Sequence, residues 1–269
     1  FFKEEIICNS CEEKYPIIFD VPVLITKKKC ESLGLDYYTE SFKEKIIDLT
    51  LFKKNEFGIM ALNEILVYTN GILYEKINKP TKYPIPDIPF ERNQSDKNLL
   101  IDIGCGWGRW TISAAQKGYN AVGIDKNLIW LIFAKKMAEQ LNIKNCNFIC
   151  CDVLNLPIKD ISFDKVYSFS FLQHFSEENL QIILNQIHKI IKPKGVFKTL
   201  MVNKYSLRGL YNEYKIKNSR IEMLQKGRIE ERIDDNNFNV RYFSIKKINN
   251  MFKLNFNLKN FQSYCFFTQ

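Results

Sequence analysis

The sequence lacks the features that mark membrane-spanning or disulfide-stabilised proteins. No run of about 18 uncharged apolar residues occurs, so no transmembrane helix is predicted. The first residues, FFKEEIICNS, have no basic segment followed by an apolar core, so no signal peptide is predicted either. The eight cysteines are scattered, and several fall in apolar strand-like runs, where a reduced buried thiol is the ordinary state. These observations favour a cytoplasmic protein without a membrane partner.

Histidine and acidic residues are also scarce. There are two histidines, His174 and His188, and 30 acidic residues against 39 basic ones, which gives a formal net charge of +9. The lysines occur singly or in pairs, a pattern typical of a solvated surface, so the charge leaves a nucleic-acid partner open without favouring one. With 46% hydrophobic residues the chain can bury a large core.

From residue 99 onward, short apolar runs alternate with helix-length amphipathic segments. The first predicted helix, RWTISAAQKG, ends at Gly118, and the second, over 128–141, begins after the N-cap Asn127. A third helix begins after Ser176 and ends at KPKG. Strands are predicted at NLLIDIG, NAVGID, CNFICCD, DKVYSFS and VFKTLMV. This alternation predicts an α/β protein with a doubly wound parallel sheet and ligand sites at the carboxyl ends of its strands.

The flanks differ from this core. Residues 41 to about 79 are predicted to be helical, and KPTKYPIPDIPFERNQSDKN then inserts four prolines. The insertion at about 204–240 is polar and charged, and the tail MFKLNFNLKNFQSYCFF is predicted to form two late strands. We therefore expect three parts: an N-terminal segment 1–30, a helical cap with a Pro-rich linker 41–95, and a core domain 96–269.

The segment LLIDIGCGWGRW, residues 99–110, places three glycines behind an apolar strand. Gly104, Gly106 and Gly108 are spaced G-x-G-x-G, with Asp102 two residues before them. This spacing differs from the dinucleotide fingerprint G-x-G-x-x-G, which argues against a nicotinamide dehydrogenase, and no Gly-Lys-Ser/Thr follows, which excludes a P-loop. Glycines at the first strand-to-helix turn let the backbone pass close to a ligand.

Acidic residues end the next two strands. Asp125 ends the second strand about 20 residues after Gly104, where a carboxylate accepts both hydroxyls of a ribose. Asp152 follows the third strand, and beside the N–H of Val153 it would read the amino edge of an adenine; a turn or helix-capping aspartate is the alternative. The loop and the acids together indicate an adenosine-containing cofactor.

With these positions the sequence resembles the class I S-adenosylmethionine-dependent methyltransferases. Their ordered landmarks are matched by LLIDIGCGWG, AVGIDKN, CCDVLNLP, FDKVYSFSFLQHF and IIKPKGVF. The resemblance implies a Rossmann-like fold, S-adenosylmethionine as cofactor and methyl transfer as activity, with the loop at the methionine moiety. The cofactor-binding residues that it implies are Asp102, Gly104, Cys105, Gly106, Asp125, Lys126, Asp152, Val153, Phe171 and Leu172.

Fewer sequence features point to the residues that would bind or activate the methyl acceptor. His174, at the carboxyl end of the fourth strand, is the candidate base, with a packing or capping residue as the alternative. Tyr83, Arg241 and Tyr242 are candidates for the acceptor pocket, with surface or interdomain packing as the alternative.

The leading interpretation is methyl transfer to O, N or C of a small or medium organic acceptor. Methylation of RNA or protein stays an alternative, although no Asn-Pro-Pro-Tyr motif follows the fourth strand. A non-catalytic subunit that binds S-adenosylmethionine is a further alternative. Fold alone does not name the acceptor, and the oligomeric state is left open.

The first 30 residues hold Cys8-x-x-Cys11, which is half of a tetrahedral zinc site. This segment resembles the second half of a zinc ribbon associated with methyltransferases, in which Tyr-Pro and a Pro-Val-Leu strand follow the cysteines, as Tyr15 and Pro22 do here. The first cysteine pair of such a ribbon would lie before Phe1, so either a preceding segment completes it or the ribbon has degenerated. Two thiolates alone predict no tight zinc site within these residues.

Overall fold

The computed structural model divides the chain into two compact units. The first unit comprises Phe1–Tyr167 with Ile190–Lys198, and the second comprises Ser168–Lys189 with Thr199–Gln269. No helix within the described ranges combines the length and apolar character that a membrane span requires. The structure describes residues 5–35, 37, 85–91, 98–205, 231–233 and 239–258.

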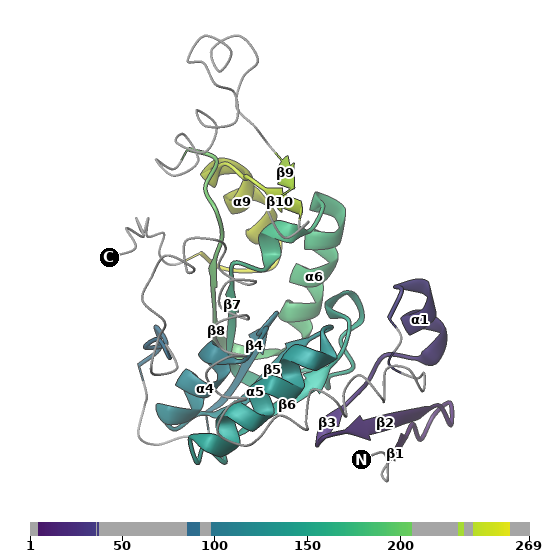
Figure 1. Cartoon of the computed structure of the whole chain (residues 1–269). Coiled ribbons are helices and arrows are strands. Elements are labelled where there is room, and N and C mark those ends of the chain that lie inside the picture. Colours follow the sequence, from purple (N-terminus) through teal and green to yellow (C-terminus); the bar gives the residue numbers. More distant parts are fainter. Residues whose placement is uncertain are drawn as a thin grey trace. The chain divides into compact units, whose positions relative to one another are not determined.

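A five-stranded sheet organises the first unit, and two of its strands run on into the second (Figure 1). The strand order is β6-β5-β4-β7-β8, and the pairs β4–β5, β4–β7 and β5–β6 are parallel. The apolar runs of β4, β5 and β6 are largely buried, as in sheets covered on both faces. The predicted Rossmann-like parallel sheet is thereby confirmed. Its strands are β4 Leu99–Ile103, β5 Asn120–Asp125, β6 Cys146–Cys150, β7 Phe163–Phe169 and β8 Ile191–Leu200.

Two helices of the first unit contact this sheet, α4 Arg109–Gln116 and α5 Leu128–Gln140. Helix α4 ends before Gly118, whose φ of +89° is the left-handed conformation of a C-terminal cap. Helix α5 begins at Asn127, whose side-chain oxygen accepts a hydrogen bond from the Trp130 N–H at 3.2 Å. Both predicted caps are therefore confirmed.

The N-terminal residues form a small antiparallel sheet that joins the edge of the large one. Val23 makes a parallel bridge to Cys150 at the end of β6, and the Leu24 N–H donates to the Cys150 carbonyl at 2.7 Å. The segment is thus hydrogen-bonded to the core domain. Its elements are β1 Glu5–Ile7, β2 Lys14–Ile18, β3 Val21–Pro22 and helix α1 Lys27–Ser32.

An ion pair joins the beginnings of three strands. The Lys192 ammonium lies 3.0 Å from both carboxylate oxygens of Asp164, and one of these oxygens also accepts the Leu99 N–H at 2.9 Å. Partial burial opposes ionisation of Asp164, but these donors outweigh it and hold its pKa below the usual range. The predicted end of the helix before KPKG is confirmed, because α6 Glu177–Ile190 ends there, but the following strand begins earlier than predicted, since β8 already begins at Ile191.

The second unit contains helix α6 Glu177–Ile190, of which all but the last residue belongs to it, and the short 3-10 helix η3 Leu172–His174. The Ser176 hydroxyl accepts a hydrogen bond from the Asn179 N–H at 3.3 Å, so the predicted N-cap of α6 is confirmed. Strands β9 Glu231–Ile233 and β10 Asn239–Arg241 pair antiparallel, and helix α9 Ile245–Phe252 follows.

The prediction of a strand at the beginning of MFKLNFNLK is wrong. Met251 and Phe252 are the last residues of helix α9, which begins after Ser244, whose hydroxyl accepts the Lys247 N–H at 3.3 Å. No strand occurs between α9 and residue 258, where the described part of the chain ends. The predicted cap 41–95 lies outside the described residues except for 85–91, as does most of the predicted insertion 204–240.

Candidate functional site

The glycine loop turns sharply between β4 and α4. Gly104, Gly106 and Gly108 have φ angles of +71°, +53° and +80°, a region that side chains other than hydrogen rarely tolerate. The N–H groups of Gly104 and Cys105 both donate to the Ile124 carbonyl at 2.9 Å. The loop is therefore fixed to the end of β5, as expected for a turn at the carboxyl ends of parallel strands.

Gly106 and Gly108 serve different purposes. A Cβ on Gly106 would meet only the ring of Trp130, at 3.6 Å, which is ordinary contact. A Cβ on Gly108 would lie 2.7 Å from the Ala134 Cβ and 2.8 Å from the Phe148 ring, closer than atoms can approach. A Cβ at Gly106 would therefore be accommodated beside Trp130 and cost only the strain of its positive φ, whereas Gly108 lets the start of α4 pack against α5 and β6.

Asp125 connects this loop to the next turn. One carboxylate oxygen accepts the Gly106 N–H at 3.0 Å, and the other accepts the Asn127 N–H at 2.9 Å. Burial raises the pKa of Asp125, and these two donors oppose the rise. A carboxylate has about four lone-pair positions, so each oxygen can accept a further donor. The partly exposed Asp125 therefore fits a ligand that presents two adjacent hydroxyls, such as a ribose.

Asp102 lies beneath the loop. Its side chain is 1% exposed, and one carboxylate oxygen accepts a hydrogen bond from the Thr111 hydroxyl at 2.8 Å. Burial raises the pKa of Asp102 to about 7, and the Thr111 hydroxyl partly opposes the rise. The side chain thus joins β4 to α4, and the predicted contact of Asp102 with a cofactor stays a prediction. Cys105 is likewise buried, with its sulfur 3.6 Å from the Gly106 carbonyl oxygen.

Asp152 caps the 3-10 helix η2, Val153–Asn155. One of its oxygens accepts the Leu154 N–H at 3.0 Å, and the other lies 3.8 Å from the Lys29 ammonium. The structure therefore shows the capping aspartate that the sequence offered as the alternative. A role at an adenine stays a prediction, as does that of the buried Val153.

Two residues of this region escaped the sequence analysis. The Tyr37 hydroxyl donates to the Lys126 carbonyl at 2.6 Å and accepts the Leu128 N–H at 3.2 Å, although no motif surrounds this tyrosine. A Cβ on Gly123 would lie 2.6 Å from the Thr111 hydroxyl oxygen. A glycine inside a strand pattern often marks such a close approach, so a signal for Gly123 was present.

The predicted acceptor residues that the structure describes lie in the second unit. Arg241 donates from its guanidinium to the His174 carbonyl at 3.0 Å, so these two residues are neighbours through the main chain. Whether the His174 imidazole acts as a base stays a prediction, as does the role of the half-buried Tyr242. Tyr83 lies outside the described residues.

Phe171 and Leu172, predicted to line the cofactor cleft, also belong to the second unit. The Phe171 ring meets the Phe175 ring edge to face, with centroids 5.0 Å apart, and Leu172 is buried. Their approach to the glycine loop stays a prediction.

Cys8 and Cys11 lie in the turn between β1 and β2. The Cys8 sulfur is 3.1 Å from the Ser10 hydroxyl oxygen, and this hydroxyl with neighbouring N–H groups lowers the Cys8 pKa to about 7. Within the described ranges, no three potential ligands gather in a way that could hold a metal ion. The zinc half-site and the ribbon resemblance therefore stay predictions.

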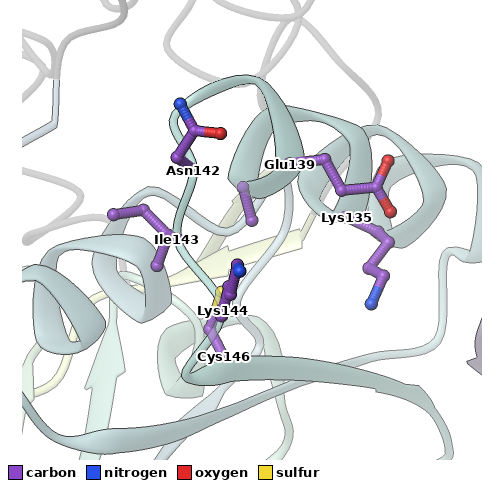
Figure 2. A pocket seen from close by; sticks show the side chains of 7 residues that line it. Lys135, Glu139, Asn142, Ile143, Lys144 and Cys146 are labelled. Atoms are coloured by element: carbon purple, nitrogen blue, oxygen red, sulfur yellow. The ribbon is translucent and has the colours of Figure 1, made fainter.

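A surface hollow of about 350 Å³ lies at the other end of β6 (Figure 2). Figure 2 shows Lys135 and Glu139 on α5, and Asn142 and Ile143 on the turn that leads into Cys146. Because Cys146 begins β6 while Asp152 follows its end, the hollow lies at the opposite edge of the sheet from the glycine loop. It is therefore separate from the candidate cofactor site. Its lining residues are Lys135, Ala138, Glu139, Asn142, Ile143, Lys144 and Cys146.

Residues 100–195 match the family model described as a methyltransferase domain. An uncharacterized protein of Methanocaldococcus jannaschii is 34% identical over 120 residues, which is 44% of this chain and 48% of that protein. The sterol 24-C-methyltransferase of Saccharomyces cerevisiae is 29% identical over 40% of this chain and 29% of its own length. A probable tRNA methyltransferase 9B of Homo sapiens is 29% identical over 39% of this chain and 22% of its own length.

The matched region thus spans less than half of each of these three relatives. Among solved structures, a SAM-dependent methyltransferase from Methanosarcina mazei is similar with a TM-score of 0.47 at 20% identity, over 58% of this chain and 78% of that one. The chain thus contains a methyltransferase domain at residues 100–195, and this match supports a class I methyltransferase with S-adenosylmethionine as its cofactor.

Proposed function

We propose that the chain transfers a methyl group from S-adenosylmethionine to a small or medium organic acceptor. The observation that carries this proposal is the Asp125 carboxylate, which binds the N–H groups of Gly106 and Asn127 and can accept two further hydroxyls. The glycine loop, whose Gly106 N–H donates to the same carboxylate at the carboxyl ends of the strands, supports a ligand at the same place. A methyl donor that contains a ribose matches both features.

The chemistry makes modest demands on side chains. When bound, S-adenosylmethionine would supply the methyl group: a bond from the acceptor atom to the methyl carbon would replace the carbon–sulfur bond, whose electron pair would stay on the sulfur of S-adenosylhomocysteine. The proton of the acceptor passes to a base or to water. The sulfonium supplies the leaving group, so alignment of the acceptor provides much of the rate. If the acceptor is a hydroxyl or a carboxylic acid, His174 is the proposed base.

Calorimetric titration of S-adenosylhomocysteine and, separately, of NAD tests the cofactor assignment. We expect the first ligand to bind and NAD not to bind. Asp125→Ala should weaken binding of S-adenosylhomocysteine about tenfold or more, because hydrogen bonds between hydroxyls and a charged carboxylate are lost. Asp87→Ala is the control, since Asp87 is exposed and pairs with Lys117 after the end of α4. Binding of NAD, or equal affinity in the Asp125 variant, would contradict the proposal.

Methylation of RNA or protein is the alternative, supported by the net charge of +9 and by the relative described as a probable tRNA methyltransferase. The relative described as a sterol methyltransferase instead supports a small organic acceptor. Incubation of a cell extract with a methyl-labelled donor separates the two. We expect label in the organic-solvent fraction of low molecular mass, whereas label sensitive to ribonuclease or protease would favour the alternative.

A further inference from the structure

We propose that the N-terminal segment, residues 5–35 with Tyr37, builds one side of the nucleoside site and that Tyr37 is a positioning residue for the Asp125 carboxylate. This inference rests on the proposed function and adds to it a part of the chain outside the matched domain 100–195. Two contacts of the segment support the inference. One lies next to Asp125 and the other next to Asp152, the two acids that the sequence predicts at the nucleoside.

The first contact is the Tyr37 hydroxyl, which bridges the turn after Asp125. It donates to the Lys126 carbonyl at 2.6 Å and accepts the Leu128 N–H at 3.2 Å. The Tyr37 side chain is 5% exposed, and burial raises its pKa, with nearby Cys150 and Asp125 adding to the rise. The hydroxyl therefore stays protonated at neutral pH and can donate and accept at the same time.

This bridge constrains the residue that the Asp125 carboxylate contacts. Asn127 lies between the two bridged residues, and its N–H donates to Asp125 at 2.9 Å. Leu128 is the first residue of α5 and is buried, so its N–H has no acceptor within the helix and cannot reach water. Without the hydroxyl this donor loses its partner, and the turn that orients Asp125 gains freedom.

The second contact is the ammonium of Lys29 in α1, which lies 3.8 Å from Asp152. Both contacts follow from the same attachment, because Leu24 is hydrogen-bonded to Cys150 at the end of β6. The chain that leaves this attachment reaches Asp152 through Lys29 and the Asp125 turn through Tyr37. The segment thus borders the carboxyl ends of β5 and β6, where ligands of such sheets bind.

Tyr37→Phe tests the inference, with Tyr119→Phe as the matched control. Tyr119 is also buried, and its hydroxyl donates to the Glu91 carbonyl at 2.7 Å, before the beginning of β5. Each variant loses one buried hydroxyl that contacts the main chain. We expect Tyr37→Phe to weaken binding of S-adenosylhomocysteine about fivefold and Tyr119→Phe to leave it within twofold of wild type. We also compare S-adenosylhomocysteine with its analogue that lacks the ribose 2′-hydroxyl. Tyr37→Phe should weaken binding of this analogue by a smaller factor than it weakens binding of S-adenosylhomocysteine.

Hydrogen exchange of the ligand-free protein supplies a second readout. After correction for global stability, the amides of Gly106 and Asn127 should exchange faster in Tyr37→Phe than in Tyr119→Phe, since both amides donate to Asp125. Unchanged affinity, unchanged ribose discrimination and unchanged exchange in Tyr37→Phe would overturn the inference while leaving the proposed function intact. If wild type binds no S-adenosylhomocysteine, the proposed function fails, and with it the nucleoside site that Tyr37 is inferred to support.

Discussion

Replacing Gly108 by alanine is expected to lower the free energy of unfolding by about 2 to 5 kcal/mol. Two costs add at this position. Its φ of +80° lies in the left-handed region, where a Cβ is strained, and the new methyl group would lie 2.7 Å from the Ala134 Cβ and 2.8 Å from the Phe148 ring. Neither neighbour is the far end of a flexible side chain, so α4 must move away from α5.

Urea unfolding followed by tryptophan fluorescence measures this loss, because all three tryptophans of the chain, at 107, 110 and 130, lie in the loop or in α4 and α5. Gly34→Ala is the matched control: its φ is +67°, but no atom of the described residues lies within 4 Å of the added Cβ. This control should cost only the strain, about 1 to 2 kcal/mol. Equal losses in the two variants would show that the neighbours of Gly108 yield without cost.

The sequence predicts the parts of this fold that depend on local patterns. The strands β4, β5 and β6 are short apolar runs, and the caps Asn127 and Ser176 act on N–H groups three residues ahead, so both are visible in a few adjacent residues. The glycine loop is visible for the same reason, since its φ angles require glycine.

The features that the sequence does not predict depend on contacts between distant residues. Tyr37 meets Lys126, and Lys192 meets Asp164, through hydrogen bonds that no local pattern encodes. The segment KPKG holds a proline and a glycine and predicts a break between helix and strand, but it lies within β8, where Lys192 pairs with Asp164. The role of Asp152 cannot be predicted from the local sequence either, because a capping aspartate and a ligand-binding aspartate occur in the same kind of turn.

Asp102→Asn is expected to remove a pH dependence from the stability of the folded protein. Unfolded Asp102 has a pKa of about 3.9, whereas burial raises the folded value to about 7. Below both values the carboxyl is protonated in both states and folding carries no cost. Between about pH 3.9 and about pH 7 the carboxyl is ionised in the unfolded state but still protonated in the folded state, so the free energy of unfolding falls as pH rises. Above about pH 7 the full cost remains, up to about 4 kcal/mol for a shift of this size.

Urea unfolding of wild type and Asp102→Asn between pH 4 and 8 measures this contribution as the difference between the two curves. Asp125, with a raised pKa, and Asp164, with a lowered one, contribute with opposite signs, but they are present in both proteins and largely cancel in the difference. Parallel curves would mean that Asp102 ionises at its ordinary pKa.

Thr111→Val provides the complementary variant. The Thr111 hydroxyl donates to Asp102 at 2.8 Å and favours the charged carboxylate, so its removal should raise the Asp102 pKa further. The fall in stability should then extend to higher pH than in wild type. Burial thus raises the pKa of Asp102, two residues before Gly104, to about 7, and the Thr111 hydroxyl keeps the carboxyl partly charged while it joins the end of β4 to the first turn of α4.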